Sequence, residues 1–140
     1  MILALDVGTR RIGVAGSDPG ENFALPLRVF QRTNLRADID RIVAIADEYG
    51  AQELVVGDPV ALSGRRGIAS DKMDRFVEGL QRRFSGQIHR VDERMTTVQA
   101  TRTLLSADVS RARRKAVVDK LAAALILETF LAKRKRQSAV

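Results

Sequence analysis

Four carboxylates in this sequence stand beside apolar segments. Asp6 ends the first apolar run of the chain, and Asp92 and Glu93 follow the apolar-rich segment before them. Asp119 belongs to the apolar stripe of a predicted helix. The other members of that stripe are Ala122, Ala123, Ile126 and Phe130. A carboxylate in apolar surroundings costs free energy unless it is paired or binds a cation, so these residue types predict an oxygen-ligand site for Mg²⁺ or Mn²⁺.

Two of these carboxylates also have a purely structural interpretation. Asp6 comes shortly before Gly8 and would suit the start of a turn. Asp119 could instead pair with Lys115 or Lys120, or lie at the edge of its stripe in the first turns of the helix, where the helix dipole favours an acid. The convergence of several acids on the ends of predicted elements, in a strongly basic chain, favours the functional interpretation.

The net charge indicates a polyanionic partner. The chain has 24 Lys and Arg against 17 Asp and Glu, a net charge of +7 and a pI near 10.7. Any single basic pair can be solvated surface, but the clusters together favour nucleic acid. These clusters are Arg10–Arg11, Arg65–Arg66, Arg82–Arg83, Arg111–Lys115 and Lys133–Arg136. Aromatic residues make up only 4% of the chain, so we expect contact with the phosphate backbone rather than base stacking.

Composition excludes several classes of site. The absence of cysteine rules out disulfides, zinc–thiolate sites and thiol nucleophiles, and the single histidine, His89, rules out a multi-histidine metal site. No apolar run approaches the ~18 residues of a membrane span, so we expect a cytosolic protein with no membrane partner. The length fits one domain, which we place at residues 1–133, followed by a basic, flexible tail at 134–140.

Hydrophobic periodicity predicts an α/β domain. Strands are expected at 2–5, 11–15, 25–30, 53–56 and 88–91, with a turn at Gly8. Helices are expected from the cap Asn34 to Gly50, over 73–84 and over 114–133, with a short helix from the capping box Thr96–Gln99 to Leu105. Three strands followed by alternating helices and strands imply a mixed sheet with an antiparallel edge and helices on both faces.

Four segments of the chain match a known pattern in order and spacing. They are LALDVGTRRIGVA, ELVVGDP, VDERMTT and VVDKLAAALIL. They resemble the YqgF/RuvX family of the RNase H-like superfamily, a family of Holliday junction resolvases and pre-16S rRNA nucleases. The resemblance implies an RNase H-like, five-stranded sheet with three antiparallel and two parallel strands, and an acidic metal site at Asp6, Glu93 and Asp119. Asp92 is the alternative to Glu93, because the motif offers two adjacent acids at a strand end.

The implied reaction is metal-dependent hydrolysis of phosphodiester bonds. Two Mg²⁺ or Mn²⁺ ions bridged by Asp6 and flanked by Glu93 and Asp119 would activate water without a side-chain nucleophile. Residues expected to contact nucleic acid are Thr9, Arg10, Arg94, Arg111, Arg113, Arg114 and Lys115. Thr9, Arg10 and Arg94 would otherwise be exposed turn residues. We expect 5′-end processing of pre-16S rRNA by a monomer or weak homodimer.

Three alternatives remain beside this interpretation. The chain could resolve Holliday junctions in branched DNA, or bind nucleic acid without cleaving it. The segment DVGTRRIGVA also resembles the phosphate loop of actin-like and sugar-kinase ATPases, but 140 residues do not supply their second domain.

The segment from Gly57 to Gly64 departs from the family pattern, with Asp58 at an apolar position and Ala61 at a polar one. Asp58 could therefore be a further ligand or substrate contact, or a turn residue.

Overall fold

The computed structural model describes residues 1–58, 68–92 and 111–138, with side chains described for 1–58, 71–92 and 121–137. The elements follow in the order β1 (Ile2–Val7), β2 (Arg11–Ser17), β3 (Ala24–Gln31), α1 (Leu35–Tyr49), β4 (Glu53–Asp58), α2 (Ile68–Arg83), β5 (Gln87–Asp92) and α4 (Arg111–Ser138).

The five strands form one mixed sheet in the order β3-β2-β1-β4-β5. The first three strands pair antiparallel, as β1 with β2 and β2 with β3. The pairs β1–β4 and β4–β5 are parallel. The predicted sheet with an antiparallel side is therefore confirmed, and β1 lies at its centre.

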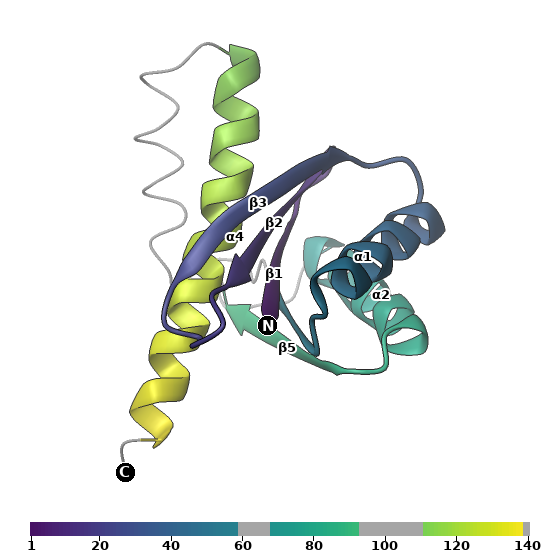
Figure 1. Cartoon of the computed structure of the whole chain (residues 1–140). Helices are drawn as coiled ribbons and strands as arrows, with labels where there is room; N and C mark the ends of the chain where they lie inside the picture. Colours follow the sequence, from purple (N-terminus) through teal and green to yellow (C-terminus); the bar gives the residue numbers. More distant parts are fainter. Residues whose placement is uncertain (59–67, 93–110, 139–140) are drawn as a thin grey trace.

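Helices cover both faces of this sheet, as predicted. Figure 1 shows α1 and α2 together on one face and the long helix α4 on the other. Alternate residues of β1 explain the two layers, because Leu3 and Leu5 join the core beneath α1 and α2, whereas Ile2 and Ala4 join the core beneath α4. A strand buried on both faces is a continuous apolar run, which is why the first five residues lack polar side chains.

Helix α1 begins and ends where the sequence predicted. The Asn34 side chain caps its first turn, accepting a hydrogen bond of 2.9 Å from the Ala37 N–H. Gly50 adopts the left-handed conformation, with φ of 67°, and its N–H closes the last turn on Ala46 and Asp47. Local capping chemistry determines both ends of this helix.

Helix α4 is longer than predicted at both ends. We expected a helix over 114–133 and a flexible tail from 134, but α4 runs from Arg111 to Ser138. Arg134 explains the difference at the carboxyl end, because its guanidinium donates to both carboxylate oxygens of Glu53, at 2.7 and 3.1 Å. Its guanidinium carbon also lies 4.5 Å from the centroid of the Phe130 ring. These contacts hold the last turns of the helix against the start of β4.

Other differences are smaller. Helix α2 begins at Ile68, five residues before the predicted start, and each strand extends beyond its predicted bounds. The short helix predicted between Thr96 and Leu105 lies outside the described residues. In the part of the chain that the structure describes, no helix is long and apolar enough to cross a membrane.

Candidate active site at the carboxyl end of the central strand

Asp6 places a carboxylate at the carboxyl end of the central strand. It shares the face of β1 that carries Ile2 and Ala4, the face covered by α4. Only 3% of Asp6 is exposed. Its strand, β1, pairs with β2 on one side and with β4 on the other. A carboxylate so deeply buried needs a partner or a cation to offset its desolvation. Asp6 is therefore the centre from which the candidate site is built.

Strand alternation places Asp92 on the other face of the sheet. Asp92 lies opposite Asp58 in the parallel register of β4 and β5. Arg90, two residues earlier on the same side of β5, donates to Asp74 of α2 at 2.7 Å. Val91, between them, packs against the core beneath α4. The structure thus separates Asp92 from Asp6 by the thickness of the sheet, while Glu93 and Arg94 lie outside the described residues.

The direction of α4 brings the backbone of Asp119 to the Asp6 end of the sheet. Arg134, near the carboxyl end of α4, contacts Glu53 at the start of β4. Because β4 is parallel to β1, the earlier turns of the helix lie towards the carboxyl ends of both strands. The predicted stripe packs against the sheet through Ala122, Ala123 and Ile126, none more than 2% exposed, with Phe130 partly buried. The side chain of Asp119 is outside the described set.

A short turn next to Asp6 exposes Thr9 and Arg10. The Gly8 N–H donates to the Arg11 carbonyl at 2.9 Å. A β-carbon at Gly8 would lie 2.9 Å from that same carbonyl oxygen, so the close approach favours glycine. The turn therefore exposes a hydroxyl and a guanidinium within four residues of the buried carboxylate, and their contact with phosphate stays a prediction.

Arg32 and Asp38 hold this turn, and sequence analysis did not identify either of them. The Arg32 guanidinium donates to the Gly8 carbonyl at 2.8 Å and to Asp38 at 2.9 Å. The backbone N–H of Arg32 also donates to the Arg10 carbonyl at 2.8 Å. Asp38, 2% exposed, accepts a further bond of 3.0 Å from the Thr33 N–H. The sequence feature that could have pointed to this pair is Asp38 itself, an acid in the first turn of α1, four residues after the cap Asn34.

Asp58 is the last residue of β4 and faces α2 rather than the Asp6 side. One of its oxygens accepts from Arg90 at 3.0 Å, and the other has no hydrogen-bond partner among the described residues. Burial opposes the charge of Arg90, but hydrogen bonds and charges from Asp74 and Asp58 outweigh it and raise the pKa of the guanidinium. The structure gives Asp58 an ion-pair role on the α2 face, and residues 59–64 of that loop lie outside the described ranges.

The predicted basic run Arg111–Lys115 forms the first turn of α4. Only its backbone is described, so the side chains of Arg111, Arg113, Arg114 and Lys115 stay predictions. Among the described side chains, no group of three or more acidic or histidine residues is arranged to hold a metal. Of the three predicted ligands Asp6, Glu93 and Asp119, only Asp6 has a described side chain.

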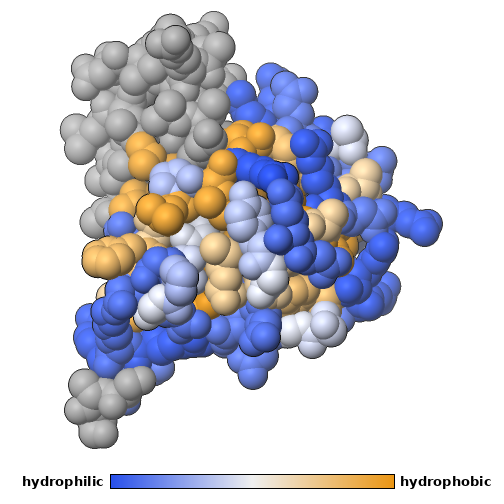
Figure 2. Space-filling model, viewed as in Figure 1, coloured by the Kyte–Doolittle hydropathy of each residue, from blue (hydrophilic) through white to orange (hydrophobic). Residues whose placement is uncertain are grey.

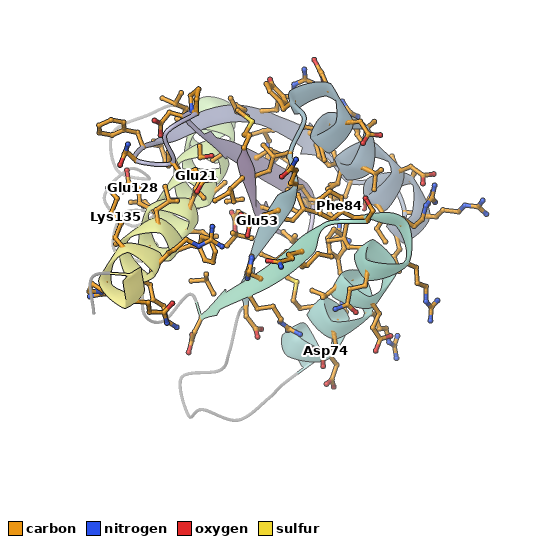
Figure 3. All side chains as sticks on the ribbon, turned by 60° about the horizontal axis from the view of Figure 1, so that its bottom comes forward. Glu21, Glu53, Asp74, Phe84, Glu128 and Lys135 are labelled. Carbon is orange, nitrogen blue, oxygen red and sulfur yellow. The ribbon has the colours of Figure 1, made fainter. Side chains whose placement is uncertain are left out.

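Glu53 connects the start of β4 with the carboxyl-terminal turns of α4, at the opposite end of the sheet from Asp6. Figure 3 shows it between the sheet and α4. Besides Arg134, its carboxylate lies 3.1 Å from Nε2 of His89. The hydrogen bond from Arg134 outweighs partial burial and, aided by His89, lowers the Glu53 pKa from 4.5 to about 2. This ion pair fixes α4 to β4 and so sets the direction in which the helix approaches Asp6.

Comparison with known sequences places the chain among nucleic-acid enzymes. The family described as "RuvX: Holliday junction resolvase" matches residues 1–133. A relative from Desulforudis audaxviator is 45% identical over 134 residues, covering 96% of this chain and 95% of the relative. A relative from Thermoanaerobacter pseudethanolicus is 44% identical over 137 residues, covering 97% of this chain and 99% of the relative. Both are named "Putative pre-16S rRNA nuclease".

Solved structures share the fold at low sequence identity. Thermus thermophilus RuvC in complex with a Holliday junction superimposes with a TM-score of 0.57 at 12% identity, covering 96% of this chain and 95% of that one. The fowlpox virus resolvase bound to Holliday junction DNA gives a TM-score of 0.52 at 8% identity, covering 94% of this chain and 97% of that one. The predicted RNase H-like fold is thereby confirmed.

Proposed function

The chain belongs to the RuvX family, and on that premise we propose that it is a metal-dependent nuclease that hydrolyses phosphodiester bonds in structured nucleic acid. The reaction we assign to it is 5′-end processing of pre-16S rRNA. The observation that carries this proposal is Asp6, a carboxylate 3% exposed at the carboxyl end of the central strand. In a chain of net charge +7, this carboxylate offers oxygen ligands to a divalent cation that attracts phosphate.

Carboxylates are the ligands that Mg²⁺ and Mn²⁺ favour, and the chain can supply three of them. Asp6 provides the first. Glu93 is the second ligand that the family motif offers, and Asp92 is the weaker choice because it shares the face of β5 with Arg90, which pairs with Asp74 of α2. Asp119 is the third, because its helical stripe is the one that packs on the sheet.

A divalent ion, when bound there, would supply an activated water and stabilise charge on the leaving oxygen. The residues of the chain perform the remaining tasks. Asp6, Glu93 and Asp119 would hold the ions, and the turn after β1 would present Thr9 and Arg10 to neighbouring phosphates. Arg32 and Asp38 keep that turn in place, so the reacting phosphate is positioned without rearrangement of the backbone.

A direct assay tests this function. Purified protein is incubated with Mg²⁺ or Mn²⁺ and either a 5′-extended precursor rRNA fragment or a four-way DNA junction. We expect metal-dependent cleavage of the RNA that disappears in Asp6→Asn, while Asp6→Asn binds RNA equally well or better because a negative charge is lost. Binding without cleavage at any metal concentration would instead identify a silent nucleic-acid binder.

A second candidate function is Holliday junction resolution, which the description of the matched family favours. A resolvase must make two symmetric incisions, so this role needs two active sites related by a two-fold axis. Paired, coupled nicks on the junction by a stable dimer would establish this second function in place of the first. Nucleotide titration tests the ATPase alternative, for which we expect no specific binding.

A further inference from the structure

A groove runs between the outer edge of β5 and the carboxyl-terminal turns of α4. Its volume is about 740 Å³, within the range of ligand-binding pockets. Strand β5 lines it from Ile88 to Asp92, and α4 lines it with Thr129, Phe130, Lys133, Arg134, Arg136 and Gln137. Asp92 is the one candidate metal ligand among these residues, and it lies on the other face of the sheet from Asp6.

Two of the four basic side chains in the groove are available to a ligand. Arg90 is held by Asp58 and Asp74, and Arg134 is held by Glu53. Lys133 and Arg136 are exposed and form no ion pair within the described part of the chain. Figure 2 shows a hydrophilic surface over this end of α4. Lys133 and Arg136 outnumber the single carboxylate of Asp92 in the lining, so the charge that remains in the groove is positive.

The aromatic ring in the groove is already engaged. The His89 ring lies 4.8 Å from the Phe130 ring, and the Arg134 guanidinium carbon lies 4.5 Å from its centroid. A base would have to displace these contacts in order to stack on Phe130. The groove thus suits the charged backbone of a ligand better than its bases, which is recognition without sequence preference.

The position of the groove connects it with the candidate active site. Its β5 wall ends at Asp92, one residue before Glu93, and its α4 wall leads along the helix towards Asp119. We propose that the groove between β5 and α4 binds one nucleic-acid strand through its phosphates, by Lys133 and Arg136, and leads that strand towards Asp6. This inference rests on the proposed function and names a second contact site for its substrate.

Protection of a single thiol locates the ligand directly. Because the chain has no cysteine, Gln137→Cys places one reactive thiol in the groove, and Gln81→Cys places one on exposed α2 as the matched control. Maleimide labelling is measured without divalent metal, so that no cleavage occurs. We expect a single-stranded RNA oligonucleotide to slow labelling of Gln137→Cys at least tenfold and to leave Gln81→Cys unchanged. Absence of protection would overturn the proposal.

Two further ligands define what occupies the groove. A blunt duplex of the same sequence and a mononucleotide at equal phosphate concentration are used in the same labelling assay. We expect neither to protect Gln137→Cys as the single strand does. Equal protection by the duplex would overturn the single-strand assignment, and equal protection by the mononucleotide would show a site for free phosphate compounds instead of a strand.

Charge removal tests the two basic residues. The variant Lys133→Gln/Arg136→Gln is compared with Lys72→Gln/Arg75→Gln, which removes the same charge from exposed positions on α2. Loss of two phosphate contacts should lower the log–log salt slope for single-strand binding by roughly 1.4 and weaken binding roughly tenfold at 0.1 M salt. The α2 variant should keep the wild-type slope. Equal slopes in both variants would overturn the role of Lys133 and Arg136.

The assays separate this inference from the proposed function. Metal-dependent cleavage with no thiol protection would overturn the groove and leave the nuclease intact. Thiol protection in a protein that cleaves nothing would support the groove and overturn the nuclease.

Discussion

At the scale of single residues, the parity of β5 places Asp92, the first of two adjacent candidate acids, on the α2 face of the sheet. Asp92 shares a face with Arg90, whose partner Asp74 lies on α2. Figure 3 shows Asp74 on α2, away from the α4 side on which Glu53 lies. The face that carries Asp92 is thus opposite to the one that carries Asp6, and the family motif offers Glu93 as the other acid, so a conservative substitution at each position should have a different effect.

Glu93→Gln and Asp92→Asn form the matched pair for this prediction. We expect Glu93→Gln to reduce metal-dependent cleavage by roughly 100-fold or more, because an electrostatic ligand of the reacting centre is lost. Asp92→Asn should stay within about threefold of the wild type. Single-turnover cleavage of the RNA substrate measures both. The reverse order of effects would assign the second ligand to Asp92.

The Glu53 carboxylate predicts how stability depends on pH. Its folded-state pKa of about 2 lies below its ordinary value of 4.5, so its contribution is present above pH 4.5 and is lost as the pH falls towards 2. Glu53→Gln should therefore destabilise the protein at pH 7 by about 1–2 kcal/mol, discounted for solvent screening. The difference from the wild type should shrink between pH 4.5 and pH 2.

Urea unfolding at pH 7, 4.5 and 3 measures this effect. Glu48→Gln is the control, because its ion pair with Arg28 has side chains 54% and 43% exposed and should contribute little. A pH-independent difference between Glu53→Gln and the wild type would show that packing, rather than charge, holds Arg134 in place.

At the scale of elements, the β3–α1 connection holds the β1–β2 turn. Arg32 lies in that connection and donates to the Gly8 carbonyl beside Asp6. Asp38, in the first turn of α1, accepts from the same guanidinium and so holds it in position. The planar guanidinium reaches Gly8 and Asp38 together, which an ammonium cannot do in the same geometry. The site is thus supported from an element that carries none of its ligands.

Arg32→Lys tests this support. We expect a loss of about 1–2 kcal/mol in the free energy of unfolding, because hydrogen bonds to charged groups contribute at that level. We also expect KM for RNA to rise severalfold more than kcat falls, because the turn that presents Thr9 and Arg10 loosens. Arg36→Lys, at an exposed position of α1, is the control and should change neither quantity. A fall in kcat with unchanged KM would argue against a role in positioning phosphates.

The first turn of α4 carries the second element-scale prediction. Arg111, Arg113 and Arg114 precede Asp119 on the same helix, so we expect them to contact phosphates near the site. Their replacement by Ala should weaken binding and lower the salt slope by roughly one unit for each lost contact. The triple variant Arg36→Ala, Lys72→Ala and Arg75→Ala is the control, at exposed positions on α1 and α2. An unchanged slope in the α4 variant would mean that these arginines only solvate the surface.

At the scale of the whole molecule, the chain offers one set of predicted ligands. Processing one end of an RNA needs a single site, whereas coupled incision of a junction needs two. We therefore predict a monomer or weak dimer whose basic activity is single-site cleavage. Sedimentation at micromolar concentration, combined with an assay that scores paired and single nicks, measures this. A stable dimer with coupled, symmetric nicks would contradict it.

Much of the fold was determined by local sequence. The caps Asn34 and Gly50 set the ends of α1, and the apolar runs of β1 and β4 predicted strands buried on both faces. These features were predictable because capping bonds and side-chain periodicity join residues close in sequence. Asp6 was recognisable for the same reason, as a charge that continues one face of a buried strand.

Tertiary structure decided what depends on residues far apart in the chain. Arg134 reaches Glu53 across 81 positions, which makes the predicted tail part of a helix. Arg32 reaches Gly8 across 24 positions, and the register of β4 with β5 puts Asp92 and Asp58 on the α2 face. No sequence periodicity encodes such pairs, because they form only when several elements pack together and bring their side chains to one place.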